Sequence, residues 1–341
     1  MTDETFAGST LQDFNNEYLM KMIAPVVFLI ICLLLGVFGN LTVLFIYGRK
    51  YSASVYRSII WNLALADLMF CLFGITFDIA RIFNYYTFKR QWICSICVSL
   101  LVLGIFYSSH LLILLSVHRF RQVCMSLGSQ VTQQTVKFWI IGCFVTAIIV
   151  TSPKPALQFY EAVKFRNNIT GHTCPISSSN PSTNAVIYSY FSLVLFAFYT
   201  VILFVIYFAI GRRIYKQHKD KQRKSESATE EKIFSKMTKI TLTVSVIFAL
   251  SYFPVFLLQI TLQSIHEDQL SSVEIACLHI VERCYVINHV ANPFIYSVFD
   301  NRFRGHFKKL LSLKFRKPVE TKTTVSATCD TSTSAVLERT F

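Results

Sequence analysis

Long apolar segments, separated by shorter polar ones, dominate the pattern of this chain. A helix needs about 20 mostly apolar residues to cross a bilayer core of roughly 30 Å. Runs of this kind occur near residues 22–47, 58–84, 93–117, 136–157, 186–211, 237–263 and 272–298. The pattern predicts an all-α membrane protein built as a seven-transmembrane helix bundle. The seventh run is the least apolar, because it carries charged and amide side chains such as Glu282 and Asn292.

The charged residues between the runs predict the orientation of the bundle. Lys and Arg gather after the first run, between the third and fourth, and most densely between the fifth and sixth, from Arg212 to Lys239. Asp and Glu gather near the N-terminus and before the seventh run. Short loops rich in Lys and Arg stay in the cytoplasm. We therefore expect a multi-pass plasma-membrane protein with its N-terminus outside and its C-terminus in the cytoplasm.

This orientation also explains the net charge of +14. A basic chain can be a nucleic-acid-binding protein. Here, however, the Lys and Arg residues lie on one side of the predicted bundle, and 53% of all residues are hydrophobic. We therefore expect contact with membrane lipid and no nucleic-acid partner.

The pattern divides the chain into four parts. Residues 1–21 form an extracellular N-terminus, and residues 22–300 form the membrane domain. Residues 301–317 combine basic and apolar side chains in the manner of an amphipathic helix on the anionic inner leaflet. Residues 318–341 are rich in Ser and Thr, which predicts a disordered cytoplasmic tail open to kinases. Asn168 begins an Asn-Ile-Thr sequon on the outer side and is a predicted glycosylation site.

Asp67 is a carboxylate near the middle of the second apolar run. Burying it charged and unpaired would cost several kcal/mol, so it needs partners. Asn288 and Asn292 share one face of the seventh run, and Ser108 offers a hydroxyl from the third. Oxygen groups around one carboxylate suit a small hard cation or a water cluster. A hydrogen-bond network that fixes helix packing explains the same residues equally well.

Two of the ten cysteines lie where connecting segments meet the outer face. These are Cys94 and Cys174, and disulfides persist on that side of a membrane. Two free thiols remain the alternative. Most of the other cysteines lie within or beside apolar runs and are expected to be small buried hydrophobic residues.

Five short motifs follow one another in a fixed order. They are Gly39-Asn40, Asn62-Leu-Ala-Leu-Ala-Asp67, Cys94, Trp139 and Asn292-Pro293-Phe-Ile-Tyr296. In this order they resemble the rhodopsin-like (class A) G-protein-coupled receptors, most closely the peptide (neuropeptide) receptor branch. The resemblance covers about residues 22–310. It implies a short amphipathic eighth helix on the cytoplasmic face, a heterotrimeric G protein as partner, and binding of arrestin and receptor kinases through the tail.

The resemblance also implies roles for particular residues. It pairs Cys94 with Cys174 in a disulfide. It implies an allosteric sodium ion, with no other cofactor, bound by Asp67, Ser108, Asn288 and Asn292. It places the activation switch and the G-protein contacts at Arg119, Leu127, Tyr207, Phe248, Tyr252, Pro254 and Tyr296.

Several switch positions depart from the family pattern. Arg119 follows His118, where most members have an acidic residue, so the resting contact of Arg119 is open. From the sequence alone, a basic residue at this boundary is usually just a membrane-interface anchor. Tyr252 stands where the family usually has tryptophan, and Tyr199 stands where it usually has proline.

The expected ligand pocket is aromatic and apolar, with a few charged groups. We expect it to be lined by Phe77, Asp78, Arg81, Leu101, Ile105, Phe106, Phe191, Phe256, Gln259 and Glu282. Leu101 replaces the aspartate of amine receptors, and Val286 replaces the lysine that binds retinal in opsins. Two interpretations of the charges stay open. They form an internal salt bridge, or Asp78 and Glu282 bind a basic group of a ligand.

Together these observations predict a receptor that binds an extracellular ligand, expected to be a small peptide, and activates a heterotrimeric G protein. A lipid, a nucleotide or another small molecule is the alternative ligand. An ion-coupled transporter is a more distant alternative, and it lacks support because the two halves of the chain show no repeat. An enzyme is not expected, since the scattered histidines lack ligand spacing.

Overall fold

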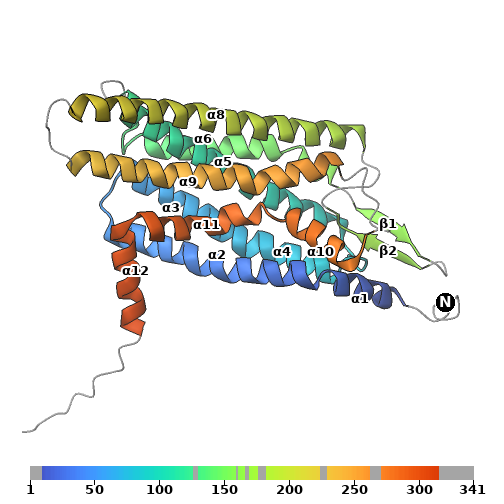
Figure 1. Ribbon diagram of the computed structural model, residues 1–341. Helices are drawn as coiled ribbons and strands as arrows, with labels where there is room; N and C mark the ends of the chain where they lie inside the picture. The colour runs from blue at the N-terminus through green and yellow to red at the C-terminus, as the bar shows by residue number, and fades with distance from the viewer. Residues whose placement is uncertain are drawn as a thin grey trace, which may run out of the picture.

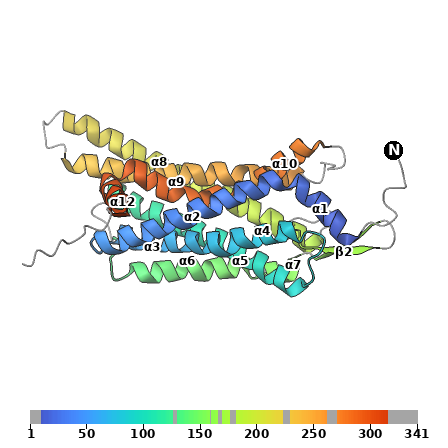
Figure 2. The same cartoon turned by 90° about the horizontal axis from the view of Figure 1, so that it is seen from below.

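The protein is a bundle of long, roughly parallel and antiparallel helices, seen in a computed structural model (Figure 1). The structure describes residues 10–125, 130–158, 160–165, 169–175, 182–222, 229–261 and 270–314. Its helices are α1 (Leu11–Lys21), α2 (Ile23–Lys50), α3 (Val55–Met69), η2 (Phe70–Ile75), α4 (Thr76–Phe83), α5 (Gln91–Cys124), α6 (Val136–Thr151), α7 (Lys154–Leu157), α8 (Thr183–Gln222), α9 (Thr229–Thr261), α10 (Ser272–Val281), α11 (Val286–Phe299) and α12 (Asn301–Lys314). Helix α5 packs against α3, α6, α8 and α9 (Figures 1 and 2).

Six helical segments of the described chain are long and apolar enough to cross a membrane. They are Ile23–Lys50, Val55–Phe83, Gln91–Cys124, Val136–Leu157, Thr183–Lys216 and Thr238–Leu258. The seventh span is made of α10 and α11, which are too short to be counted singly. The expected seven-helix bundle is confirmed, with the polar seventh run divided in two.

The break in the seventh span is a local tightening of the helix. From Arg283 to Asn288, most backbone N–H groups bond to the carbonyl three residues earlier, as in Cys284 N to Val281 O at 3.1 Å. Such a 3₁₀-like turn keeps the backbone bonded while it rotates the side chains on either side. Irregular backbone at membrane depth is tolerated where it is buried in protein, and Arg283 and Val286 are buried here.

Small residues bring the first and seventh spans together. A Cβ atom added to Gly39 would lie 2.8 Å from Cγ of Pro293, so only glycine fits against α11 at this point. The neighbouring Asn40 donates from Nδ2 to the carbonyl of His289 at 2.9 Å. The Gly39-Asn40 motif therefore fixes the contact between α2 and α11.

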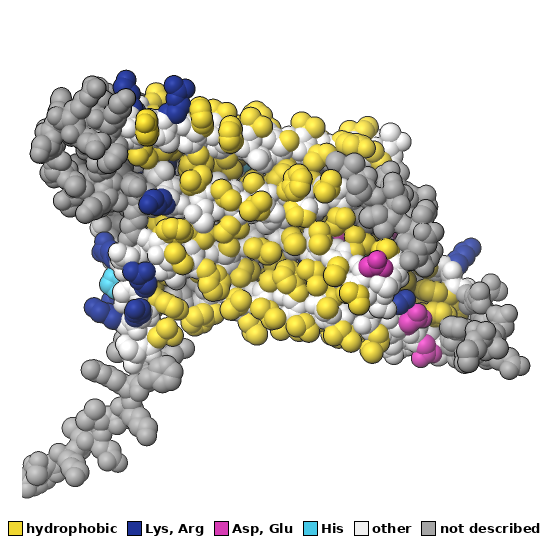
Figure 3. Space-filling model, viewed as in Figure 1, with side chains coloured by type: hydrophobic (Ala, Val, Ile, Leu, Met, Phe, Trp, Pro, Cys, Tyr) yellow, Lys and Arg dark blue, Asp and Glu magenta, His cyan; other side chains and the backbone are white. Residues whose placement is uncertain are grey.

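The surface has the charge distribution of a membrane protein. An apolar belt covers its middle, and the Lys and Arg side chains gather mainly at the end that carries α12, while the visible Asp and Glu lie at the opposite end (Figure 3). Large apolar side chains in the belt are well exposed, including Phe204 at 70%, Phe138 at 65% and Leu34 at 65%. Exposure on this scale requires a lipid environment.

The end opposite α12 carries a two-stranded hairpin and an additional helix, and is called the hairpin end here. Strand β1 (Glu161–Lys164) pairs antiparallel with β2 (Thr170–Thr173), with Glu161 opposite Thr173. Helix α1 lies beside the hairpin, where the ring of Phe14 stacks on Phe165 with centroids 4.4 Å apart. The hairpin lies in the connection between the fourth and fifth spans.

The hydrophobic pattern did not predict helix α1, because this helix is mostly polar. Its main sequence signal is the capping motif at its first turn. Thr10 and Asp13 form a capping box, and the hydrogen bonds from Thr10 lower the pKa of Asp13. Asn15 docks the helix, because its side chain donates to the carbonyl of Phe83 at 2.8 Å and accepts from the N–H of Tyr86 at 3.0 Å. The predicted extracellular N-terminus therefore includes an ordered helix.

Helix α12 turns sharply away from α11 at the other end (Figure 1). Asp300 accepts from the backbone N–H of Arg302 at 3.0 Å and from the hydroxyl of Tyr51 at 2.7 Å. Phe303 is buried against Tyr296, so the helix is anchored by one apolar face. Its position matches the expected eighth helix, of which residues 315–317 lie outside the described part.

Candidate functional site

A buried polar cluster surrounds Asp67, which is fully buried on α3. Ser108 donates from its hydroxyl to Oδ1 at 3.0 Å, and Asn292 donates from Nδ2 to Oδ2 at 2.7 Å. The third partner is His289, whose Nδ1 lies 2.8 Å from Oδ1. The structure therefore brings together three of the four expected residues and adds a histidine.

Asn288 is also buried, but its side chain is directed to the hydroxyl of Tyr252. The sequence did not single out His289, because one histidine in an apolar run carries no spacing signal. These residues do not fit a hard cation on Asp67. Such a cation takes several oxygen ligands, often about six, whereas here three donor groups are directed at the carboxylate.

A second charged cluster lies nearer the hairpin end. Asp78 is buried and accepts from two guanidinium groups, the i,i+3 partner Arg81 and Arg283 of the seventh span, whose Nε lies 3.0 Å from Oδ2. Arg81 also donates to the carbonyl of Cys174 at 3.1 Å. Asp78 thus belongs to an internal salt bridge, the first of the two open interpretations.

Glu282 differs from Asp78, because 26% of its side chain is exposed. Its Oε2 lies 2.7 Å from Nδ1 of His279 and 3.3 Å from Arg283. Arg283 was not among the expected site residues. An arginine inside an apolar run is itself a signal of a functional or paired group, and that signal was available in the sequence.

The disulfide between Cys94 and Cys174 is present, which confirms the predicted pairing. It joins α5 to the segment that follows β2, eighty residues further along the chain. Phe77 packs against it. Because Arg81 bonds to the carbonyl of Cys174, the disulfide and the charged cluster hold the hairpin end together.

The other expected pocket residues are distributed around the same end. Leu101 and Phe106 are buried, Ile105 is partly buried, and Phe191 is 48% exposed. Phe256 stacks on Phe196 at 4.6 Å. The side chain of Gln259 and the sequon residue Asn168 lie outside what the structure describes.

Arg119 lies against an aromatic ring. Its guanidinium carbon lies 4.2 Å from the centroid of the Tyr56 ring, and its Nη1 donates to Oε1 of Gln122 at 2.6 Å. The cation–π contact joins the third span to the second. His118, which stands where most members of the family have an acidic residue, is itself buried.

The other residues expected to form the switch line the interior of the bundle. Tyr207 exchanges a hydrogen bond with Ser116 at 2.8 Å, and Tyr296 is buried beside Tyr47. Phe248 and Tyr252 pack together on α9, which contains Pro254. Leu127 lies outside the described residues.

Tyr199 has a structural partner that explains its departure from proline. Its hydroxyl lies 2.5 Å from Nε2 of His110 on α5. Nδ1 of the same ring lies 3.1 Å from the carbonyl of Cys143 on α6. A side-chain hydrogen bond thus ties α8 to α5 and α6 where a proline kink would otherwise shape the fifth span.

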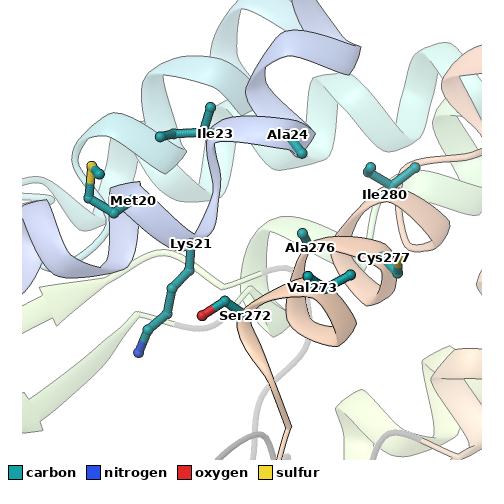
Figure 4. Close-up of a pocket in the computed structure, with 9 residues that line it drawn as sticks. All are labelled: Met20, Lys21, Ile23, Ala24, Ser272, Val273, Ala276, Cys277 and Ile280. Carbon is teal, nitrogen blue, oxygen red and sulfur yellow. The ribbon is translucent and has the colours of Figure 1, made fainter.

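An open crevice lies at the surface of the hairpin end, between the α1–α2 junction and α10 (Figure 4). Its volume is about 360 Å³, and it is lined by Met20, Lys21, Ile23, Ala24, Ser272, Val273, Ala276, Cys277 and Ile280. The lining is mainly apolar, and it contains none of the expected ligand-binding residues. The crevice is therefore separate from the predicted pocket.

Comparison with known proteins places this geometry in a family. Melanin-concentrating hormone receptor 1 of Homo sapiens is 25% identical over 315 residues, covering 91% of this chain and 86% of that protein. The allatostatin-A receptor of Bombyx mori is 23% identical over 308 residues, covering 88% and 83%. The C3a anaphylatoxin chemotactic receptor of Oncorhynchus mykiss is 31% identical over 134 residues, covering 39% and 36%.

The family model described as 7 transmembrane receptor (rhodopsin family) matches residues 39–296. This range contains the Asp67 cluster, the charged cluster, the disulfide and the aromatic contact of Arg119. The chain therefore belongs to the rhodopsin family of seven-transmembrane receptors.

Proposed function

We propose that this receptor lies in the plasma membrane, binds a peptide at its hairpin end from outside, and activates a heterotrimeric G protein at its α12 end. The gathering of Lys and Arg at the α12 end supports this orientation (Figure 3). The disulfide at the opposite end also supports it, because disulfides persist on the outer side.

The class of ligand follows from the relatives. Melanin-concentrating hormone receptor 1 and the allatostatin-A receptor are peptide receptors, and both match nearly the whole chain. Similarity of this degree establishes a common fold. It does not by itself establish a common ligand, so the peptide class is our proposal.

The observation that carries the proposal is the partly open carboxylate of Glu282. Asp78, Arg81 and Arg283 are buried and neutralise one another in part, whereas a quarter of the Glu282 side chain reaches the surface. Oε2 is engaged by His279 and Arg283, and no hydrogen bond to Oε1 occurs within the described chain. A basic or amidated end of a peptide would bind this carboxylate.

The experiment is a screen of basic and amidated peptides, with lipids and nucleotides as comparison ligands, on cells that express the receptor, read out by calcium and cyclic nucleotide. We expect at least one peptide to signal through the wild type and to lose its signal in Arg119→Ala, which should still reach the surface. Signals that persist in Arg119→Ala would contradict the assigned coupling role. A screen in which only lipids or nucleotides act would overturn the peptide proposal.

The Ser- and Thr-rich tail, residues 318–341, is proposed to bind receptor kinases and arrestin after phosphorylation. Glycosylation of Asn168 is likewise a proposal. No catalytic step is part of the proposed function.

A further inference from the structure

His289 is held in the centre of the bundle by contacts on several sides. Its side chain is fully buried, and its ring stacks on Phe70 with centroids 3.8 Å apart. Nδ1 faces Asp67 at 2.8 Å, and Nε2 lies 3.4 Å from the hydroxyl of Tyr252. Its own carbonyl accepts from Asn40. The ring of this seventh-span residue therefore contacts the second and sixth spans, and its backbone carbonyl is bonded to the first.

The hydrogen-bond roles around Asp67 follow from chemistry. An ionised carboxylate only accepts, so the imidazole Nδ1 must carry a hydrogen in this contact, whatever the overall charge of the ring. Ser108 directs its hydroxyl hydrogen at Oδ1, and Asn292 directs its NH₂ group at Oδ2. Asp67 is thus faced by three hydrogens.

These hydrogens occupy the approaches that a cation would need. A metal ion requires oxygen lone pairs directed at it, and hydrogens bound to nitrogen or oxygen carry partial positive charge that repels it. Two buried amide oxygens, Asn40 Oδ1 and Asn292 Oδ1, have no partner among the residues that the structure describes. Two neutral oxygens are too few to complete the shell of a hard cation.

We propose that His289 replaces the sodium ion that the family resemblance implied. Its imidazole is a built-in partner of Asp67, and it makes this receptor insensitive to sodium. A bound ion can dissociate, whereas an imidazole that is covalently part of α11 cannot. His289 thus links Asp67 permanently to Tyr252 and moves only when α11 moves.

This inference rests on membership of the receptor family, and its test needs neither a ligand nor a G protein. The purified full-length receptor is melted in sodium chloride and in choline chloride at equal ionic strength. A ligand that binds only the folded state raises the melting temperature. We expect the wild type to melt at the same temperature in both salts.

The decisive variant is His289→Ser, which empties the ring volume and supplies a hydroxyl oxygen. We expect it to melt about 2 °C or more higher in sodium than in choline. The double variant Asp67→Asn/His289→Ser should lose this difference, because the carboxylate is gone. His289→Leu keeps the volume without an oxygen, and it should show no sodium response.

Two results would overturn the proposal. The first is a sodium-specific rise in the melting temperature of the wild type, a measurement that depends on no variant. The second is a well-folded His289→Ser that gains no sodium response. Failure of the peptide screen would leave both melting measurements unaffected, so the two proposals are tested separately.

Discussion

Asp78 is the residue whose replacement the structure predicts most sharply. Only 2% of its side chain is exposed, and it lies between the guanidinium groups of Arg81 and Arg283. In Asp78→Asn, two buried positive charges would share one neutral amide. Arg283 would keep Glu282 at 3.3 Å, but among the described residues Arg81 would keep only the carbonyl of Cys174, at 3.1 Å, as a hydrogen-bond partner.

The size of the effect follows from the stranded charge. Removing one partner of a buried ion pair typically costs about 3–5 kcal/mol. We expect about 3 kcal/mol, at the low end, because Arg283 keeps a second carboxylate. At roughly 2 °C per kcal/mol for a chain of this size, the melting temperature of the purified receptor should fall by about 6 °C.

A compensating variant distinguishes a charge effect from a packing effect. Asp78→Asn/Arg81→Met removes the stranded cation, so it should recover part of the loss, a coupling that a double-mutant cycle measures. A wild-type melting temperature for Asp78→Asn would contradict the predicted cost of the buried charges. So would a double variant that is no more stable than Asp78→Asn alone.

Three further predictions follow from other contacts. Tyr56→Leu removes the cation–π contact of Arg119, worth about 1 kcal/mol, and should raise ligand-independent signalling by about fivefold, whereas Tyr56→Phe keeps the ring and should not. Tyr199→Phe breaks the hydrogen bond to His110 and should cost about 1 kcal/mol in thermal stability; an unchanged melting temperature would mean that the bond contributes nothing. Glu282→Gln should weaken a cationic agonist tenfold or more, about 1.4 kcal/mol, and unchanged affinity would leave Glu282 with a structural role alone.

The sequence predicted the architecture because the bilayer imposes a local rule. A span must be about 20 apolar residues long and must satisfy its own backbone, so the runs mark the helices without any knowledge of their packing. The sequence analysis did not predict the division of the seventh span, which occurs where Glu282 and Arg283 interrupt its apolar character. The hydropathy pattern did not predict helix α1, because this helix is short and polar. It is held in place by the hydrogen bond from Asn15 to the carbonyl of Phe83, which is distant in the sequence.

The partners of the polar residues were harder to predict. The family motifs brought Asp67, Ser108 and Asn292 together, but nothing in the sequence placed the ring of His289 on the same carboxylate. That contact depends on how α11 rotates after the tightened turn at 283–288 and on how closely Gly39 lets α2 approach Pro293.

The sequence by itself thus determined the number of spans, the polar character of the seventh span and the family. Only the tertiary structure decided the partners of the buried polar groups. His289 contacts Asp67, Arg283 contacts Asp78, the Tyr56 ring contacts Arg119, and His110 contacts Tyr199. The reason is physical. Hydropathy acts along the sequence over about 20 residues, whereas a hydrogen bond between helices depends on distances of about 3 Å that only the packed bundle sets.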